Sequence, residues 1–286
     1  IPKERLGLLF GLRLFIGGGL SILASGLIGV ILAGNVFGLT LTFPDNYALL
    51  FAVSSTLFIL GCVFFGFIKE QPDEVPARTT PMREQFSRAG RVLKSDPRFL
   101  RFLFMRVALM FALTCIPFIT VYAKRELNVS DATFGALVPV ALIAGLFSNL
   151  VWARINDRRS SRTVLALCSI FGLVLCGIAL ALTQWGSSAL VLLPAAYALG
   201  GIISSGIGVS TTPQMIEIVP AGHGPLYFGL LNTLLGVAML FTSLVGLIVD
   251  QFGYTTLFVF CAACFALALN RVWMLRPSPT PIKPVA

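Results

Sequence analysis

The sequence predicts an all-α membrane protein built as a bundle of eight transmembrane helices. Of the 286 residues, 57% are hydrophobic and only 12% are charged, which is about half the charged fraction of an average soluble domain. The apolar residues gather into runs of about 20, the length that crosses a hydrocarbon core of about 30 Å as a helix. Runs so long and continuous exclude the short alternating strands of a membrane barrel.

We expect the eight spans at 13–34, 46–68, 98–123, 132–153, 163–183, 188–211, 225–249 and 254–275. Small residues recur at a spacing of four in the sixth of these spans, with a second row beside the first. These residues are Gly200, Ser204, Gly208 and Thr212, and beside them Gly201 and Ser205. Small side chains let helix backbones approach closely, so the rows predict either a tight packing surface or a surface that slides during a conformational cycle.

The basic residues fall almost entirely on one side of this arrangement. If both ends and alternate loops face the cytoplasm, nineteen of the twenty-one Lys and Arg lie inside, and only Lys124 and Arg125 lie outside. Loops rich in Lys and Arg stay on the cytoplasmic side, so we expect both termini in the cytoplasm and the protein in a bacterial inner membrane. The net charge of +9 then reflects topology and not binding to nucleic acid.

The longest inside loop, 71–97, has a helical pattern in its second part. Met82, Phe86, Ala89 and Leu93 recur at helical spacing among basic residues. This pattern predicts an amphipathic helix at the membrane surface, in contact with the lipid bilayer through anionic headgroups or with the ends of the bundle.

The span 98–123 contains the deepest charge of the chain. Asp96 and Pro97 fit its N-cap and first residue, which places Arg106 nine residues further on, roughly 13 Å along the helix axis. Arg106 either snorkels to the headgroups or pairs structurally, or it contacts a substrate or a gate. Pro117 lacks a backbone N–H and predicts a kink in this span, and Pro139 predicts one in the next.

Catalytic chemistry has little support, so we expect no enzyme, no cofactor and no metal site. The one histidine, His223, lies among glycines and prolines, and no carboxylate lies in mid-span to pair with it. Six cysteines fall in spans and fit small apolar packing residues better than disulfides: Cys62, Cys115, Cys168, Cys176, Cys261 and Cys264.

Polar side chains within the spans are sparse, and they either bond a neighbouring helix or line a wet cavity. They are Thr114, Asn149, Tyr197, Ser204, Ser205, Thr211, Gln214, Asn232 and Thr233. A mostly apolar cavity with a few hydrogen-bonding groups suits a small organic solute. Both interpretations stay open for each residue.

The segment ARINDRRSSR, residues 153–162, joins two uncharged runs and predicts a tight cytoplasmic loop. It resembles the loop motif of the major facilitator superfamily, G-x-x-x-D-R-x-G-R-R. Asp157 and Arg158 match the D-R pair, and Arg162 matches the last basic position. The segment departs from the pattern at Ala153, Ser160 and Ser161.

The layout of the chain adds to the resemblance. The opening IPKERLGLLFGLR resembles the loop that enters the family's fifth helix, and 71–97 resembles the link between its two six-helix halves. The resemblance implies a fragment that holds helices five to twelve, with the first four helices as missing partners. Residues 1–70 would then end the N-terminal half, 98–276 would form the C-terminal half, and 277–286 would be a cytoplasmic tail.

The resemblance implies a secondary transporter of a small solute that works by alternating access, its halves rocking about a central site. Asp157 would contact neighbouring helix ends when the cytoplasmic side is shut, with Arg158 and Arg162 as partners or lipid anchors. Alternatively, these three residues only orient the loop. Residues on the helices that face the family's cavity become the candidate solute contacts: Thr114, Asn149, Tyr197 and Asn232, with Arg106 at the inner mouth.

Coupling and solute stay open. No Asp or Glu lies in the middle of a span, so a proton relay would need groups in the missing helices. A membrane scaffold or sensor that acts through loop 71–97 is the alternative from another class. A scaffold would tolerate the loss of polar span residues, whereas a transporter would not.

Overall fold

The computed structural model describes residues 6–32, 35–36, 39–40, 44–67, 82–220, 222–242 and 244–275. The chain divides into two compact units: Gly19–Pro81, and Ile1–Gly18 together with Met82–Ala286. The start of the opening segment, the first part of loop 71–97 and the tail 277–286 lie outside the described residues.

The described residues confirm the all-α membrane bundle but not the count of eight spans. Six helical stretches are long and apolar enough to cross a membrane: Asp45–Gly66, Pro97–Arg125, Ala136–Arg158, Ser161–Ile218, Gly224–Thr242 and Val245–Met274. The stretch Ser161–Ile218 has 58 residues, roughly 87 Å if it were straight. It turns back near Gly186 to give two helices, α7 (Ser161–Trp185) and α8 (Leu193–Ile218), which pack against each other.

The smaller unit contains the second part of α1 (Leu6–Leu32) and the whole of α2 (Asp45–Gly66). Between them, β1 (Asn35–Val36) and β2 (Leu39–Thr40) pair antiparallel, with Asn35 opposite Thr40. The sequence did not predict this short hairpin. Large apolar side chains of α2 are exposed within this unit, including Phe51 and Phe58, as in a helix with a lipid-facing surface.

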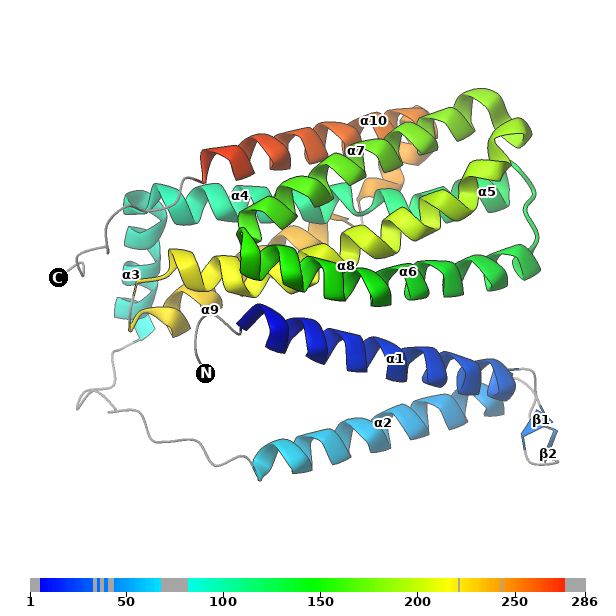
Figure 1. Ribbon diagram of the computed structural model, residues 1–286, viewed down its shortest axis with the longest axis horizontal. Coiled ribbons are helices and arrows are strands. Elements are labelled where there is room, and N and C mark those ends of the chain that lie inside the picture. The colour runs from blue at the N-terminus through cyan, green and yellow to red at the C-terminus, as the bar shows by residue number, and fades with distance from the viewer. Residues whose placement is uncertain are drawn as a thin grey trace. The chain divides into compact units, whose positions relative to one another are not determined.

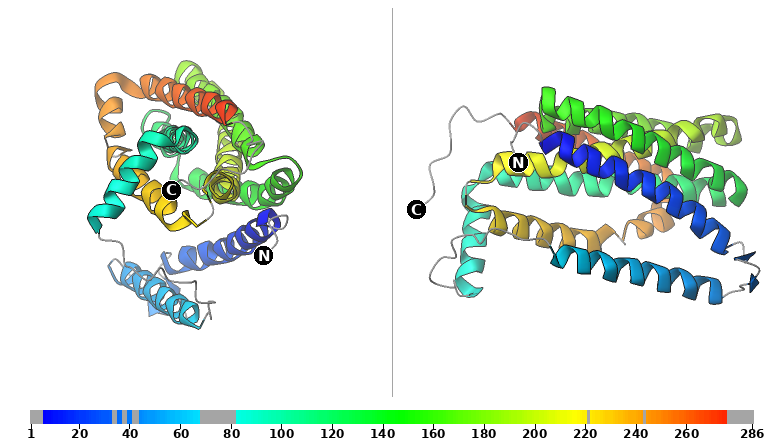
Figure 2. Two further views of the ribbon diagram at one scale, coloured as in Figure 1. Left: turned by 90° about the vertical axis from the view of Figure 1, so that its left-hand side faces the viewer. Right: turned by 60° about the horizontal axis from the view of Figure 1, so that its bottom comes forward.

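The larger unit is a bundle of helices that lie side by side, with α3 running across their ends (Figures 1 and 2). Helix α6 packs chiefly on α8, α7 packs on α8 and α10, and α4 packs on α10. In chain order its elements are α3 (Met82–Ser95), α4 (Pro97–Ala112), α5 (Cys115–Arg125), α6 (Asp131–Arg158), α7, the 3₁₀ helix η2 (Gly186–Leu192), α8, α9 (Gly224–Thr242) and α10 (Val245–Met274). The helix that the sequence predicted in loop 71–97 is therefore confirmed as α3.

Side-chain caps fix where three of these helices begin. The Oδ1 atom of Asp96 accepts hydrogen bonds from the backbone N–H groups of Arg98 and Phe99 at 3.0 and 3.1 Å, which confirms the predicted N-cap of α4. Ser130 and Ser160 cap α6 and α7 in the same way.

The predicted span 98–123 is divided between α4 and α5, with Leu113 and Thr114 between them. In a regular helix the carbonyl of Leu113 would accept from residue 117, but Pro117 has no N–H. The backbone N–H of Ile116 donates to the Leu113 carbonyl instead, at 3.2 Å. The kink expected from Pro117 is confirmed, whereas α6 continues as one helix through Pro139.

The predicted span 225–249 is also divided. Helix α9 ends at Thr242, and the last residues of the predicted span belong to α10. Helix α10 then bends at Gly253, whose φ of 79° is in the left-handed region. Glycine adopts such a φ without a steric cost.

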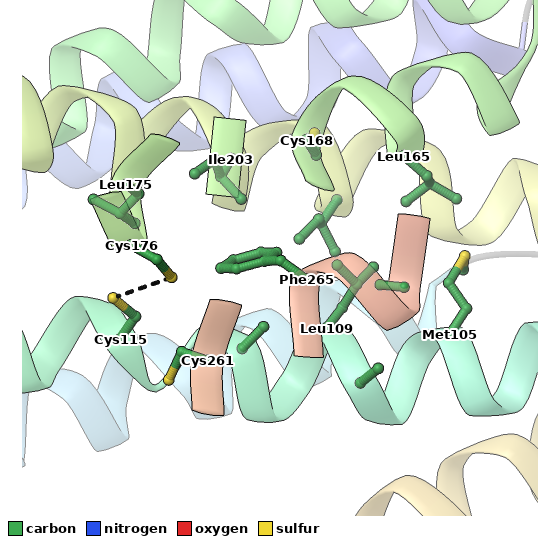
Figure 3. Packing of buried hydrophobic residues seen from close by; sticks show 14 of the residues in the cluster. Met105, Leu109, Cys115, Leu165, Cys168, Leu175, Cys176, Ile203, Cys261 and Phe265 are labelled. Atoms are coloured by element: carbon green, nitrogen blue, oxygen red, sulfur yellow. Dashed lines mark hydrogen bonds between the residues drawn. The ribbon is translucent and has the colours of Figure 1, made fainter. Parts of the chain in front are cut away.

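The core of the larger unit is apolar and closely packed. Phe265 is fully buried among side chains of α4, α7 and α10 (Figure 3). A Cβ atom on Gly172 would lie 2.3 Å from the Phe265 ring, so α7 approaches α10 closely only because residue 172 has no side chain. In contrast, Phe147 and Val151 of α6 are 62% and 55% exposed, as expected of side chains that contact lipid.

Candidate functional site

The interface between α6 and α8 contains two of the predicted polar residues and a close approach of the two backbones. A Cβ atom on Gly201 would lie 2.0 Å from the carbonyl oxygen of Ala141, and one on Gly145 would lie 3.1 Å from the carbonyl oxygen of Gly201. Ser204 and Gly208, in the predicted first row of small residues, are exposed. The packing surface is therefore the second row, which begins at Gly201.

Polar bonds cross this close contact. The hydroxyl of Ser205 on α8 donates to Oδ1 of Asn149 on α6, and Trp152 Nε1 donates to the carbonyl oxygen of Ile202 at 2.9 Å. Asn149 is only 6% exposed. Of the two interpretations of Asn149, this geometry supports bonding between helices.

Tyr197 has a different partner. Its hydroxyl lies 2.6 Å from the hydroxyl of Thr120, so the pair joins α8 to α5 beyond the Pro117 kink. We did not single out Thr120 from the sequence. The feature of the sequence that could have identified Thr120 is a hydroxyl within an apolar span, the same feature that identified Thr114.

Thr114 lies at the break between α4 and α5, close to a group of thiols. Its hydroxyl donates to the carbonyl of Phe111 at 2.6 Å and lies 3.5 Å from Sγ of Cys261. Next to it, the Sγ atoms of Cys115 and Cys176 are 3.8 Å apart (Figure 3). All six cysteines are free thiols, and the buried Cys115, Cys168, Cys176 and Cys261 agree with the prediction of packing residues, whereas Cys62 is exposed.

Asn232 lies on α9 and is exposed in the larger unit. The five candidate solute contacts thus come from α4, α6, α8, α9 and the break before α5. Within the described part of the chain, no hydrogen bond joins two of them. The same residues include no group of three or more His, Cys, Asp or Glu that could hold a metal ion.

The predicted loop 153–162 is mostly helical, which corrects the interpretation of ARINDRRSSR. Helix α6 continues to Arg158 and α7 begins at Ser161, so only Arg159 and Ser160 lie between them. Charge marks where a helix leaves the hydrocarbon and not where it ends. The motif residues Asp157 and Arg158 are exposed in the last turn of α6.

Arg162 occupies the first turn of α7 and reaches across the bundle. Its guanidinium donates to the carbonyl oxygen of Leu275, directly after α10. Arg101 of α4 donates to the neighbouring carbonyl of Met274 at 3.1 Å. Two arginines from different helices therefore hold the free carbonyls at the end of α10, where cations are favoured by the helix dipole.

We call the end of the bundle that carries α3, Arg101 and Arg162 the α3 end. At this end the hydroxyl of Tyr227 donates to Oδ2 of Asp96 at 2.9 Å, while the other carboxylate oxygen caps α4. The ring of Tyr227 also packs edge-on against Phe99, with 5.2 Å between centroids. Asp96 thus connects the start of α9 to the start of α4 through hydrogen bonds.

Comparisons with known proteins give the same fold. A model of the Major Facilitator Superfamily matches residues 103–286. The crystal structure of a bacterial homologue of the iron transporter ferroportin in the outward-facing state matches with a TM-score of 0.67 and 18% identity, over 96% of this chain and 65% of that chain. The structure of such a homologue with soaked iron gives 0.59 and 19%, over 96% and 64%.

Two fungal relatives match a shorter part. Autophagy-related protein 22-1 of Aspergillus niger is 28% identical over 160 residues, which cover 52% of this chain and 26% of that protein. Autophagy-related protein 22-2 of Aspergillus clavatus is 27% identical over 158 residues, which cover 51% and 26%. The match spans about a quarter of the length of these curated relatives.

The family model covers the bundle from the first turns of α4 to the end of the chain, and the solved neighbours share the helical fold of nearly the whole chain. The apolar outer surface of the bundle is that of an integral membrane protein. This chain belongs to the Major Facilitator Superfamily.

Proposed function

We propose that this chain is part of a secondary transporter that moves a small organic solute by alternating access. The observation that carries the proposal is the family match over residues 103–286. The fold shared with the ferroportin homologues supports it. The described carboxylates of the larger unit lie at or near helix ends, so a proton relay through a mid-span carboxylate would use other helices.

The proposed solute contacts are polar groups of the bundle that can form further hydrogen bonds in addition to those they form within the protein. The hydroxyls of Tyr197 and Thr120 each have further capacity beyond their mutual bond. Asn232 is exposed on α9. Few polar groups among apolar side chains favour an organic molecule over a bare inorganic ion.

We propose that the α3 end faces the cytoplasm of a bacterial cell, although the two relatives named above are fungal. In the larger unit, Lys124 and Arg125 are the described basic residues at the opposite end, after α5. The α3 end carries the others, including Arg158 and Arg162. Such an asymmetry supports a cytoplasmic α3 end.

Asp157, Arg158 and Arg162 remain the proposed gating residues. Arg162 already ties α7 to the end of α10, so a change of this contact would accompany any sliding of these two helices at the α3 end. Asp157 and Arg158 lie in the last turn of α6, and in this proposal they contact helix ends that approach when this side closes.

A flux experiment with a mixture of natural solutes tests the proposal. Proteoliposomes that contain the protein are loaded with deproteinised cell extract, and the solutes that leave are identified by mass spectrometry against empty liposomes. We expect protein-dependent loss of one class of small molecules, which Asp157→Asn or Arg158→Ala slows at least tenfold. Arg159→Ala, a neighbouring change outside the motif positions, should transport normally.

Efflux identical to that of empty liposomes would instead favour the scaffold or sensor. Normal flux in both gating variants would leave transport standing but remove the gating roles of Asp157 and Arg158.

A further inference from the structure

Arg106 differs from the other arginines that are directed into the α3 end of the bundle. Arg101 and Arg162 donate to backbone carbonyls after and near the end of α10. The guanidinium of Arg271 lies 5.9 Å from the centre of the Phe104 ring, within the range of a cation–π contact. Each of these three cations has an identified partner within the protein, although Nε of Arg271 is also buried without a hydrogen bond among the described residues.

Arg106 has no such partner among the residues that the structure describes. Arg106 on α4 is partly exposed, but its Nε atom is buried and forms no hydrogen bond with the described residues. Among the described residues, no carboxylate forms an ion pair with it. Arginine stays protonated in proteins, so the bundle holds a partly buried positive charge that has no counter-charge among the described residues.

The surroundings of Arg106 favour an anion as that counter-charge. The described carboxylates of the larger unit lie at helix ends or beyond them, and Glu217, near the end of α8, hydrogen-bonds to Gln214 and interacts with Arg162. The α3 end is otherwise rich in arginine. A basic rim of this kind raises the local concentration of anions and repels cations, and a planar guanidinium can bind a carboxylate or phosphate through two parallel hydrogen bonds.

We propose that Arg106 binds the oxyanion of the transported solute, so that the substrates are organic anions that carry a carboxylate or a phosphate. This inference rests on the proposed transport function and names its substrate class. The same oxyanion chemistry is found in lipid headgroups, which Arg106 would reach if it snorkelled towards the α3 end. The solute is favoured because the Nε atom of Arg106 is buried within the bundle.

The test compares acids with neutral molecules of the same shape. The purified protein in dodecyl maltoside, which has no phosphate, is heated with benzoate or benzamide, succinate or succinamide, and glycerol 3-phosphate or glycerol. We expect at least one acid to raise the unfolding midpoint by several degrees while its neutral counterpart does not. Arg106→Gln should abolish that difference, and Arg106→Lys should keep only part of it because an ammonium cannot form the paired bonds.

Arg101→Gln is the matched control, an arginine on the same helix whose partner is a carbonyl. It should keep the acid-dependent shift even if it lowers the midpoint without ligand. Because Arg106→Gln removes an unpaired buried charge, its own midpoint without ligand should equal or exceed that of the wild type. This result separates loss of binding from loss of folding.

Three results would overturn the proposal: no acid distinguished from its neutral counterpart, a shift that survives in Arg106→Gln, or an Arg106-dependent shift caused by added phosphatidylglycerol alone. The last result would identify a lipid site. The binding proposal and the transport proposal are contradicted by different results. An acid-dependent shift without efflux from proteoliposomes would support the anion site and contradict transport. Efflux restricted to neutral solutes would support transport and contradict the anion site.

Discussion

Gly201 of α8 lies against the backbone of α6 so closely that a Cβ atom at residue 201 would be 2.0 Å from the carbonyl oxygen of Ala141. A backbone carbonyl cannot move aside by changing its rotamer, so the helices themselves would have to separate. We expect Gly201→Ala to lower the free energy of unfolding by about 3 kcal/mol, the upper range for overpacking. Thermal unfolding of the purified protein measures this change.

Gly177→Ala on α7 is the control for that measurement, because a Cβ atom there would meet nothing within 4 Å. Alanine is favoured over glycine within a helix by about 1 kcal/mol, so the control should be neutral or stabilising. Equal effects at the two positions would contradict the close approach of α6 and α8.

Asn149 and Asn232 should respond differently to alanine. Removing Asn149 leaves the Ser205 hydroxyl without its acceptor in an apolar interface, which costs about 1 kcal/mol for a hydrogen bond between membrane helices. Asn232 is exposed on α9, so Asn232→Ala should leave the unfolding midpoint unchanged while it alters solute efflux. A lower midpoint for Asn232→Ala would show that this residue is structural.

Asp96 performs two tasks that substitution can separate. Tyr227→Phe removes only the hydrogen bond to Oδ2 and should cost about 2 kcal/mol, as for a bond to a charged group. Asp96→Ala also removes the cap of α4, which adds about 1 kcal/mol. Chemical or thermal unfolding of both variants and of the double variant checks whether the Tyr227 effect disappears once Asp96 is absent.

The exposed basic side chains of α3 should bind anionic lipid. Arg91 and Lys94 are exposed, while Val92 and Leu93 pack against the core. Each basic residue near an anionic surface contributes about 1 kcal/mol. The double change Arg91→Glu with Lys94→Glu should therefore weaken phosphatidylglycerol binding by at least tenfold in native mass spectrometry, whereas Arg125→Glu at the opposite end should not.

The orientation can be read from thiol labelling. Glu126→Cys introduces a thiol after α5, and Arg159→Cys introduces one between α6 and α7. These two positions are at opposite ends of the bundle. In intact cells, a membrane-impermeant maleimide should label residue 126 and not residue 159, and inverted vesicles should give the opposite pattern. The wild type supplies the background of the native thiols. Labelling of residue 159 in intact cells would reverse the proposed topology.

The sequence predicted best those features that depend on local chemistry. The cap at Asp96 and the break before Pro117 follow from one side chain or one missing N–H, and both are confirmed. The end of α6 was placed wrongly because hydropathy locates the membrane boundary, whereas Arg154 to Arg158 form a regular helix beyond it. The hydropathy of a helix therefore does not predict how far the helix extends beyond the membrane.

Partners across helices were less predictable. Asn149 stood out as polar, but its bond to Ser205 depends on the approach of Gly201 to α6, which brings two distant segments together. Thr120 was missed for the same reason, since its relation to Tyr197 arises only in the folded bundle. The predicted domain limits at residues 70, 97 and 276 stay predictions.

The turn between α7 and α8 has a consequence for biosynthesis. From Thr163 to Ile216 the chain carries no charged side chain, and the turn at Gly186 with the short η2 helix joins the two long helices. Transferring this turn to the far side of the membrane moves no ionised group through hydrocarbon, where Asp, Lys or Arg would each cost about 3 kcal/mol at the centre. The insertion machinery can therefore release α7 and α8 into lipid as one hairpin, its direction set by the arginines that precede α7.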